Sequence, residues 1–91
     1  MEYKDTVNGM LSSDYKERFV AEYQQTKIRY EKLKKFCNKI EAAEIMCRKP
    51  PVHDCPMHLL RNQQSVMGEY LRILELRAEI EGIELPCSVL A

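Results

Sequence analysis

One row of mostly apolar side chains in the first half of the chain limits the folds that it can adopt. Its members recur at spacings of three and four residues, which is the pattern of one face of a long α-helix. The row consists of Phe19, Tyr23, Thr26, Tyr30, Leu33, Cys37, Ile40 and Ala43. Such a face needs a partner, and a chain of 91 residues has room for only one other long helix. We therefore expect an all-α fold in which helices pack on helices.

The first long helix is predicted over residues 14–47, after a leader or short helix at residues 1–12. Asp14 is the expected N-cap, and Glu17 three residues later completes an acidic capping box. Two consecutive prolines cannot continue the helix, so residues 48–55 are expected to form a turn.

The second long helix is predicted over residues 56–82. Asp54 or Cys55 is the expected N-cap, with Pro56 at the first helical position, where a missing N–H costs nothing. Gly82 is a favoured C-terminal residue. Two long helices joined by a short turn predict an antiparallel helical hairpin, and the length predicts a single domain over residues 1–91.

The second helix carries two neighbouring apolar rows, although a helix that packs on one surface needs only one. One row is Leu59, Val66, Tyr70, Ile73 and Ile80, and the other is Leu60, Met67, Leu71, Leu74 and Ala78. Contacts on two sides indicate a homo-oligomer, with one row facing the first helix and the other facing a second subunit. The alternative is one wide face that packs against the hairpin partner and the apolar tail, residues 83–91.

Composition narrows the class of protein without identifying its function. Lys+Arg and Asp+Glu number 14 each, so the net charge gives no argument for nucleic acid or a membrane as the partner. No apolar run approaches the roughly 18 residues of a spanning helix, and the N-terminus lacks the apolar core of a secretory signal. We expect a cytoplasmic protein whose four cysteines are reduced.

Basic residues are concentrated in the middle of the first helix, where a single acid, Glu31, accompanies them. They are Lys27, Arg29, Lys32, Lys34, Lys35 and Lys39. This run keeps a positive field that could hold an anion such as a phosphate. The alternative is a solvated helix face. The charges do not form one stripe, and no recognition-helix motif is present, so DNA is not the expected partner.

Tyr15 lies at the expected N-terminus of the first helix, which favours anions. Its ring can stack on a nucleobase while nearby N–H groups and Arg18 meet a phosphate. The alternative is an ordinary packing contact, as expected for Tyr23, Tyr30 and Tyr70 on the apolar rows.

No pattern predicts a metal site or an active site. Cys47, His53, Cys55 and His58 surround the turn, but their spacing does not match a zinc knuckle. The sequence shows no triad around a histidine, no glycine-rich phosphate loop and no catalytic pair of carboxylates. We therefore expect neither an enzyme nor a cofactor.

The two helices resemble small phage and prophage helical-hairpin proteins over roughly residues 14–85. The pattern that carries the resemblance is Arg-x3-Glu-x10-Leu-x2-Phe followed by Leu-x7-Met-x2-Tyr-x3-Leu-x2-Arg. Here its positions are Arg18, Glu22, Leu33 and Phe36, then Leu59 or Leu60, Met67, Tyr70, Leu74 and Arg77. This group resembles the phage anti-CBASS sponge proteins, which are helical oligomers, hexamers in the characterised cases. They sequester cyclic oligonucleotide signals without cleaving them, and so block bacterial immune effectors.

The resemblance implies a cyclic di- or trinucleotide as the ligand and the cytoplasm of an infected bacterial host as the location. It implies that Tyr15 stacks on a base and that Arg29 contacts a phosphate, with Lys27 and Lys32 as neighbours. It also implies a homo-oligomer, a hexamer by the same resemblance, with pockets at subunit interfaces. Two features depart from the pattern: Thr26 in the apolar row, and the cysteine-bearing, proline-rich turn.

A second functional hypothesis stays open from the sequence. The basic face of the first helix could bind another protein, which would make the chain a helical interaction module such as another anti-defence inhibitor. A structural coiled-coil protein is the third hypothesis. Loss of ligand binding in Tyr15→Ala and Arg29→Ala would favour the sponge over either alternative.

Overall fold

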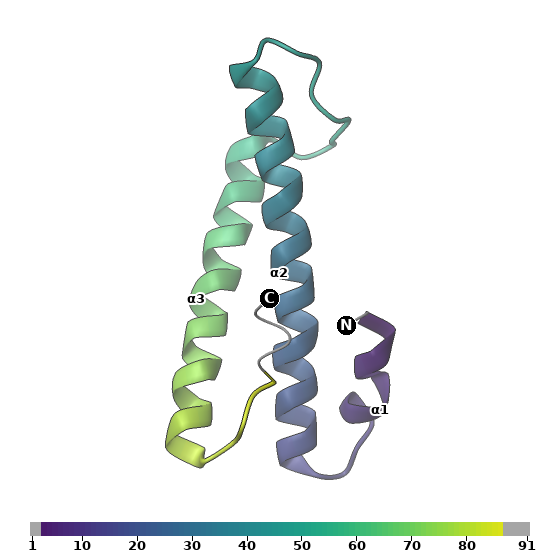
Figure 1. Cartoon of the computed structure of the whole chain (residues 1–91), viewed down its shortest axis with the longest axis vertical. Coiled ribbons are helices and arrows are strands. Elements are labelled where there is room, and N and C mark those ends of the chain that lie inside the picture. The colour runs from purple at the N-terminus through teal and green to yellow at the C-terminus, as the bar shows by residue number, and fades with distance from the viewer. Residues whose placement is uncertain (1–2, 87–91) are drawn as a thin grey trace.

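The computed structural model describes residues 3–86, and this part of the chain is built from helices and loops (Figure 1). Its elements are a 3-10 turn η1 (Tyr3–Thr6), a short helix α1 (Val7–Met10), and the long helices α2 (Tyr15–Ile45) and α3 (Met57–Glu81). The predicted all-α class is confirmed for these residues.

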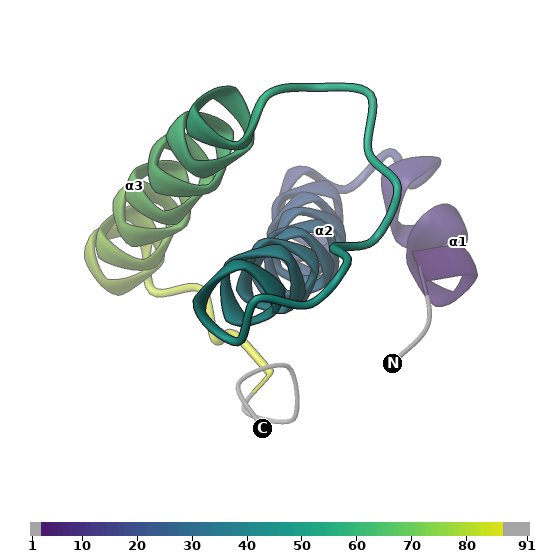
Figure 2. The same cartoon turned by 90° about the horizontal axis from the view of Figure 1, so that it is seen from above.

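Helices α2 and α3 run antiparallel beside each other, and α1 lies on the opposite side of α2 from α3 (Figures 1 and 2). The molecule is elongated, with extents of 49 × 25 × 22 Å. A long connection joins the end of α2 to the start of α3, and the segment after α3 turns back toward α2 (Figure 1). No helix of residues 3–86 is long and apolar enough to cross a membrane.

The start of α2 is fixed by side-chain caps. The Asp14 carboxylate accepts a hydrogen bond from the Lys16 N–H at 2.9 Å, so its predicted role as N-cap is confirmed. The predicted capping box is wrong, because Glu17 does not reach back to the Asp14 N–H. The Ser12 hydroxyl instead accepts from the Asp14 N–H at 3.0 Å and donates to the Glu17 carboxylate.

The end of α2 at Ile45 comes two residues before the predicted boundary and requires an unusual backbone at Cys47. The Cys47 and Arg48 N–H groups bond to the carbonyls of Glu44 at 3.2 Å and Ala43 at 2.7 Å. These are the paired bonds of a Schellman motif, which needs a left-handed residue at the Cys47 position. Cys47 has φ 56°, a conformation that costs a residue with a Cβ about 1–2 kcal/mol relative to the right-handed region.

Glycine at this position is expected to stabilise the fold. Cys47→Gly removes the left-handed strain but makes the unfolded chain more flexible, so the net gain in unfolding free energy is about 0.5–1 kcal/mol. Cys47→Ala is the matched control, since it removes the thiol and keeps the strain. Urea denaturation measures both variants. A glycine variant no more stable than the alanine variant would contradict the strained cap.

The boundaries of α3 differ from the prediction at its start. Pro56 is the N-cap with φ −59° and ψ 147°, and Met57 is the first helical residue, so the expected caps at Asp54 or Cys55 are wrong. Pro56 still makes its carbonyl available to the first turn. At the other end Gly82 adopts φ 71° and ends the helix, as predicted.

The core lies where the N-terminal half of α2 meets the C-terminal half of α3. It consists of Phe19, Tyr23, Leu71, Leu74, Ala78 and Ile83, with Val20, Tyr30 and Leu85 packed against it. Ile83 and Leu85 show that the first residues of the predicted tail pack on the hairpin; residues 87–91 lie outside the described part of the chain. Burial, followed by the hydrogen bond from its hydroxyl to Glu75 at 2.7 Å, raises the pKa of Tyr23.

The two apolar rows of α3 have opposite environments. Leu71, Leu74 and Ala78 of the second row are buried, and Leu60 and Met67 are half-buried. All members of the first row are exposed: Leu59 by 50%, Val66 by 61%, Tyr70 by 39%, Ile73 by 43% and Ile80 by 84%. The hairpin therefore uses one row and leaves the other uncovered in the single chain. The alternative of one wide face also involves residues 87–91 of the tail, which lie outside the described part of the chain.

The short helix α1 packs closely on α2 through small residues. A Cβ on Gly9 would lie 2.7 Å from the Cβ of Ala21, closer than real Cβ contacts. Gly9 lies inside α1 and is a point at which this helix contacts α2. This contact holds the N-terminal segment beside the first turns of α2.

Candidate ligand-binding site

The predicted site residues fall into two groups along α2. Tyr15 and Arg18 belong to its first turn, whereas Lys27, Arg29 and Lys32 lie near its middle. Tyr15 and Arg29 are fourteen residues apart, which corresponds to about 21 Å along the axis. One chain therefore does not bring both groups to one small ligand.

Four of the five residues nevertheless share one side of the helix. Arg29 follows Arg18 by eleven residues, which is about three turns. Tyr15 lies three residues before Arg18, and Lys32 lies three residues after Arg29. We call this line, with Glu22 and Gln25 between, the α2 stripe. Lys27 is two residues from Arg29 and points elsewhere; its amine lies 3.5 Å from the Glu31 carboxylate and 5.7 Å from the centre of the Tyr30 ring.

Tyr15 and Arg18 line a cleft of about 250 Å³ at the start of α2, together with Met10, Phe19 and Glu22. The cleft combines aromatic and apolar surface with one guanidinium group, that of Arg18, and one carboxylate, that of Glu22. The Arg18 Nη1 atom donates to the Ser12 carbonyl at 2.9 Å, which holds the guanidinium at this end of the helix. A planar base and an adjacent phosphate match such a surface chemically.

The Tyr15 hydroxyl is held by two residues of α3. It donates to the Glu81 carboxylate at 3.1 Å and accepts a short hydrogen bond from the Arg77 Nη2 atom. Arg77 also donates to Glu81 through Nε at 3.1 Å, and its Cζ atom lies 5.1 Å from the centre of the Phe19 ring. The Tyr15 and Phe19 rings are 6.1 Å apart at an interplanar angle of 56°. Tyr15 is still 46% exposed, so its ring remains accessible.

The α2 stripe and the exposed row of α3 lie on the same side of the hairpin. Partial burial, followed by a hydrogen bond to the Glu22 carboxylate, raises the pKa of Tyr70. This contact joins a member of the stripe to a member of the row. One composite face thus carries the Tyr15 cleft, the exposed apolar side chains and, farther along α2, Arg29 and Lys32.

Arg29 and Lys32 are exposed, and neither has an ion pair or hydrogen bond within residues 3–86. Unlike the charge of Lys27, their charges have no carboxylate within ion-pair distance among residues 3–86. The basic middle of the α2 stripe can therefore accept an anion from outside the chain.

Comparison with known proteins identifies a protein family whose model matches this chain. The Sequestin family model matches residues 13–80, which is more than half of the chain and includes four of the five residues that line the Tyr15 cleft. The chain belongs to the Sequestin family. The match confirms the resemblance to the phage anti-CBASS sponge proteins that bind cyclic nucleotides. Searches of curated proteins and of solved structures gave no match.

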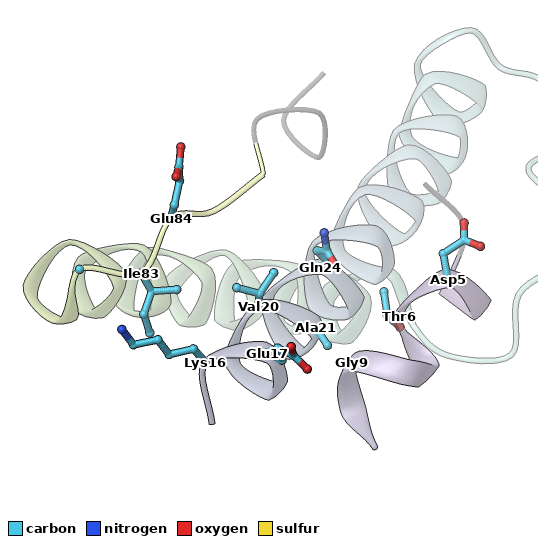
Figure 3. Close-up of a pocket in the computed structure, with 11 residues that line it drawn as sticks. Asp5, Thr6, Gly9, Lys16, Glu17, Val20, Ala21, Gln24, Ile83 and Glu84 are labelled. Carbon is cyan, nitrogen blue, oxygen red and sulfur yellow. The ribbon is translucent and has the colours of Figure 1, made fainter. Parts of the chain in front are cut away.

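A cavity larger than the Tyr15 cleft lies elsewhere in this Sequestin chain. It has a volume of about 410 Å³ and lies between α1, α2 and the segment after α3 (Figure 3). Val20 and Ala21 contribute apolar walls, but the charged groups around it include three carboxylates and one amine: Asp5, Glu17 and Glu84 against Lys16. An anionic ligand is disfavoured by that balance, so we place the candidate site at the smaller cleft, where a guanidinium lies beside an accessible aromatic ring.

The residues around the α2–α3 turn form no second site in this Sequestin chain. Within residues 3–86, no three His, Cys, Asp or Glu side chains come together in a way that could hold a metal ion. Cys37, Cys47 and Cys55 are free thiols, and Cys87 lies outside the described residues. The His53 Nδ1 atom lies 2.9 Å from the Pro51 carbonyl, which orders the turn locally.

Proposed function

We propose that the chain sequesters cyclic di- or trinucleotide immune signals, without cleaving them, in the cytoplasm of an infected bacterial host, and so inhibits CBASS-type defence. The match to the Sequestin family carries this proposal. The Tyr15 cleft supports it, because the cleft offers an aromatic ring and a guanidinium side by side at one end of the matched region.

Each group in the cleft has a role in holding such a ligand. The exposed Tyr15 ring stacks on one nucleobase, and Arg18 forms charge-assisted hydrogen bonds with a phosphate. Sequestration needs no bond to break. It requires only that affinity and copy number keep the free signal below the concentration that its effector needs. The protein is accordingly a binder and not an enzyme.

The exposed row of α3 supports assembly into a homo-oligomer, with a hexamer as the expected size from the resemblance. The five apolar side chains of this row are 39–84% exposed in the single chain. Contiguous exposed apolar surface on a small protein marks an interaction site. A second copy is the proposed occupant, since an identical apolar row meets itself in a two-fold interface.

Assembly also brings the two groups of predicted residues together. Tyr15 and Arg29 lie seven residues on either side of Glu22 along the α2 stripe. Two α2 helices that pack antiparallel about an axis near Glu22 place Arg29 of one copy level with Tyr15 of the other. Because the exposed row of α3 lies beside Glu22, the same packing covers it. Each ligand would then meet a stacking ring from one copy and an unpaired basic residue from the other.

Titration calorimetry with the full chain tests the proposal. The panel contains linear dinucleotides, cyclic di- and trinucleotides, and cyclic ADP-ribose as a cyclic anion of another class. We expect saturable binding of a cyclic di- or trinucleotide and none of the linear forms. Binding confined to cyclic ADP-ribose would retain sequestration but contradict the CBASS assignment. No binding of any cyclic nucleotide would contradict the proposed function and favour a helical protein-interaction module that uses the basic face of α2.

A further inference from the structure

We propose that Arg77 is a second anion-binding group of the Tyr15 cleft, and that Glu81 occupies its guanidinium until an anionic ligand displaces it. The inference rests on the proposed function for the identity of the ligand. It concerns α3, which contributes no residue to the site predicted from the sequence.

The first support is the geometry of the Arg77 guanidinium. It makes three contacts that fix its plane: Nε to Glu81 at 3.1 Å, Nη2 to the Tyr15 hydroxyl, and Cζ at 5.1 Å from the centre of the Phe19 ring. A guanidinium fixed in this way loses little further entropy when it binds a phosphate. It is also linked directly to the ring proposed to stack on the base.

The second support is unused donor capacity. A guanidinium has five N–H donors, and the two recorded hydrogen bonds of Arg77 occupy one at Nε and one at Nη2. The Arg77 side chain is 47% exposed, so the remaining donors are accessible from solvent. Arg18 lies on α2 and Arg77 on α3, and both adjoin Tyr15. Two guanidiniums from different helices suit a ligand that carries more than one phosphate.

The third support is the position of Glu81. One carboxylate oxygen accepts a hydrogen bond from Tyr15 and the other accepts one from Arg77. A phosphate with two free oxygens could accept the same two hydrogen bonds. An exposed i,i+4 ion pair contributes little to stability, so the fold does not depend on this pair. Glu81 therefore competes with an incoming anion for the Arg77 guanidinium, and its displacement costs the fold little stability.

Two substitutions should act in opposite directions on ligand binding. Arg77→Gln removes the guanidinium and should weaken binding of the cyclic nucleotide by about tenfold or more, since hydrogen bonds to charged groups contribute most. Glu81→Gln keeps the size of the side chain and an acceptor for Tyr15 but removes the competing charge, so binding should tighten severalfold. Calorimetric titration of each variant measures both effects.

Arg72→Gln is the matched control. Arg72 is another exposed arginine of α3, paired with Glu69 at 2.5 Å and without contact to Tyr15. Its substitution should leave the affinity unchanged. An Arg77→Gln variant that binds like the wild type, or a Glu81→Gln variant that binds more weakly than the wild type, would overturn the proposal.

A second measurement separates this inference from the proposed function. The Arg77 Nε–H resonance, assigned by its absence in Arg77→Gln, is followed by NMR while pyrophosphate is added to the full chain. We expect the resonance to shift, and to shift at lower pyrophosphate concentration in Glu81→Gln. No shift in either protein overturns the role of Arg77. A shift without binding of any cyclic nucleotide retains an anion site and contradicts only the proposed function.

Discussion

Replacement of Ile73 by glutamate is expected to convert the proposed oligomer into a monomer. Ile73 lies in the exposed row of α3 and is 43% exposed in the single chain. Full burial of an isoleucine side chain contributes about 1.5–3 kcal/mol, the exposed part of Ile73 accounts for less than half of that, and a two-fold interface contains the residue twice. An unpaired carboxylate in the same place adds a desolvation cost. The subunit dissociation constant should rise at least about a hundredfold, measured by light scattering over a range of concentrations.

Val52→Glu provides the control for this experiment. Val52 is 88% exposed in the connection between α2 and α3, away from the row. This substitution adds the same charge at an exposed apolar position and should leave the mass of the oligomer unchanged. A wild-type protein that scatters as a monomer at every concentration would contradict the assembly, as would an Ile73→Glu variant with the same mass as the wild type. Circular dichroism of both variants checks that the helices remain folded.

Tyr15→Ala is expected to weaken binding of the cyclic nucleotide by about 5- to 150-fold. This range corresponds to the roughly 1–3 kcal/mol that one aromatic side chain contributes by stacking on a base. Tyr15→Phe keeps the ring but loses the hydroxyl contacts to Arg77 and Glu81. Its affinity should therefore fall less than that of the alanine variant. Calorimetry gives the three dissociation constants.

Tyr3→Ala is the matched control for loss of an exposed tyrosine. Tyr3 is 42% exposed in η1, and the one hydrogen bond recorded for it uses its backbone carbonyl, which accepts from Thr6. Its removal should not change the affinity. Equal losses in Tyr3→Ala and Tyr15→Ala would show a general effect of the N-terminal segment and contradict stacking on Tyr15.

The helical arrangement could be predicted because periodicity and caps are local signals. The row from Phe19 to Ala43 is buried or half-buried throughout, and Asp14 and Gly82 act as helix ends where the sequence placed them. The start of α3 was missed by one residue, because a proline suits either the first helical position or the position before it. The left-handed Cys47 was not foreseen, since glycine or asparagine usually marks that conformation.

The candidate site was predictable only along α2. Helical spacing relates Tyr15 to Arg18, and both line the same cleft. Arg77 and Glu81 reach Tyr15 from more than sixty residues away, and no spacing rule reports such a contact. The predicted antiparallel hairpin gave the available signal, because it places the end of α3 near the start of α2. Lys27 was grouped with Arg29 by charge, although residues two apart on a helix point in different directions.

The proposed sponge removes a cyclic nucleotide from solution and holds it intact. The most direct test mixes excess protein with the cyclic nucleotide that binds in the titration, separates the free ligand by filtration, and then denatures the complex by heat. Mass spectrometry quantifies the ligand before and after denaturation. We predict that free ligand disappears on mixing and returns chemically unchanged on heating. A ligand that stays free, or that returns as a cleaved product, would contradict sequestration.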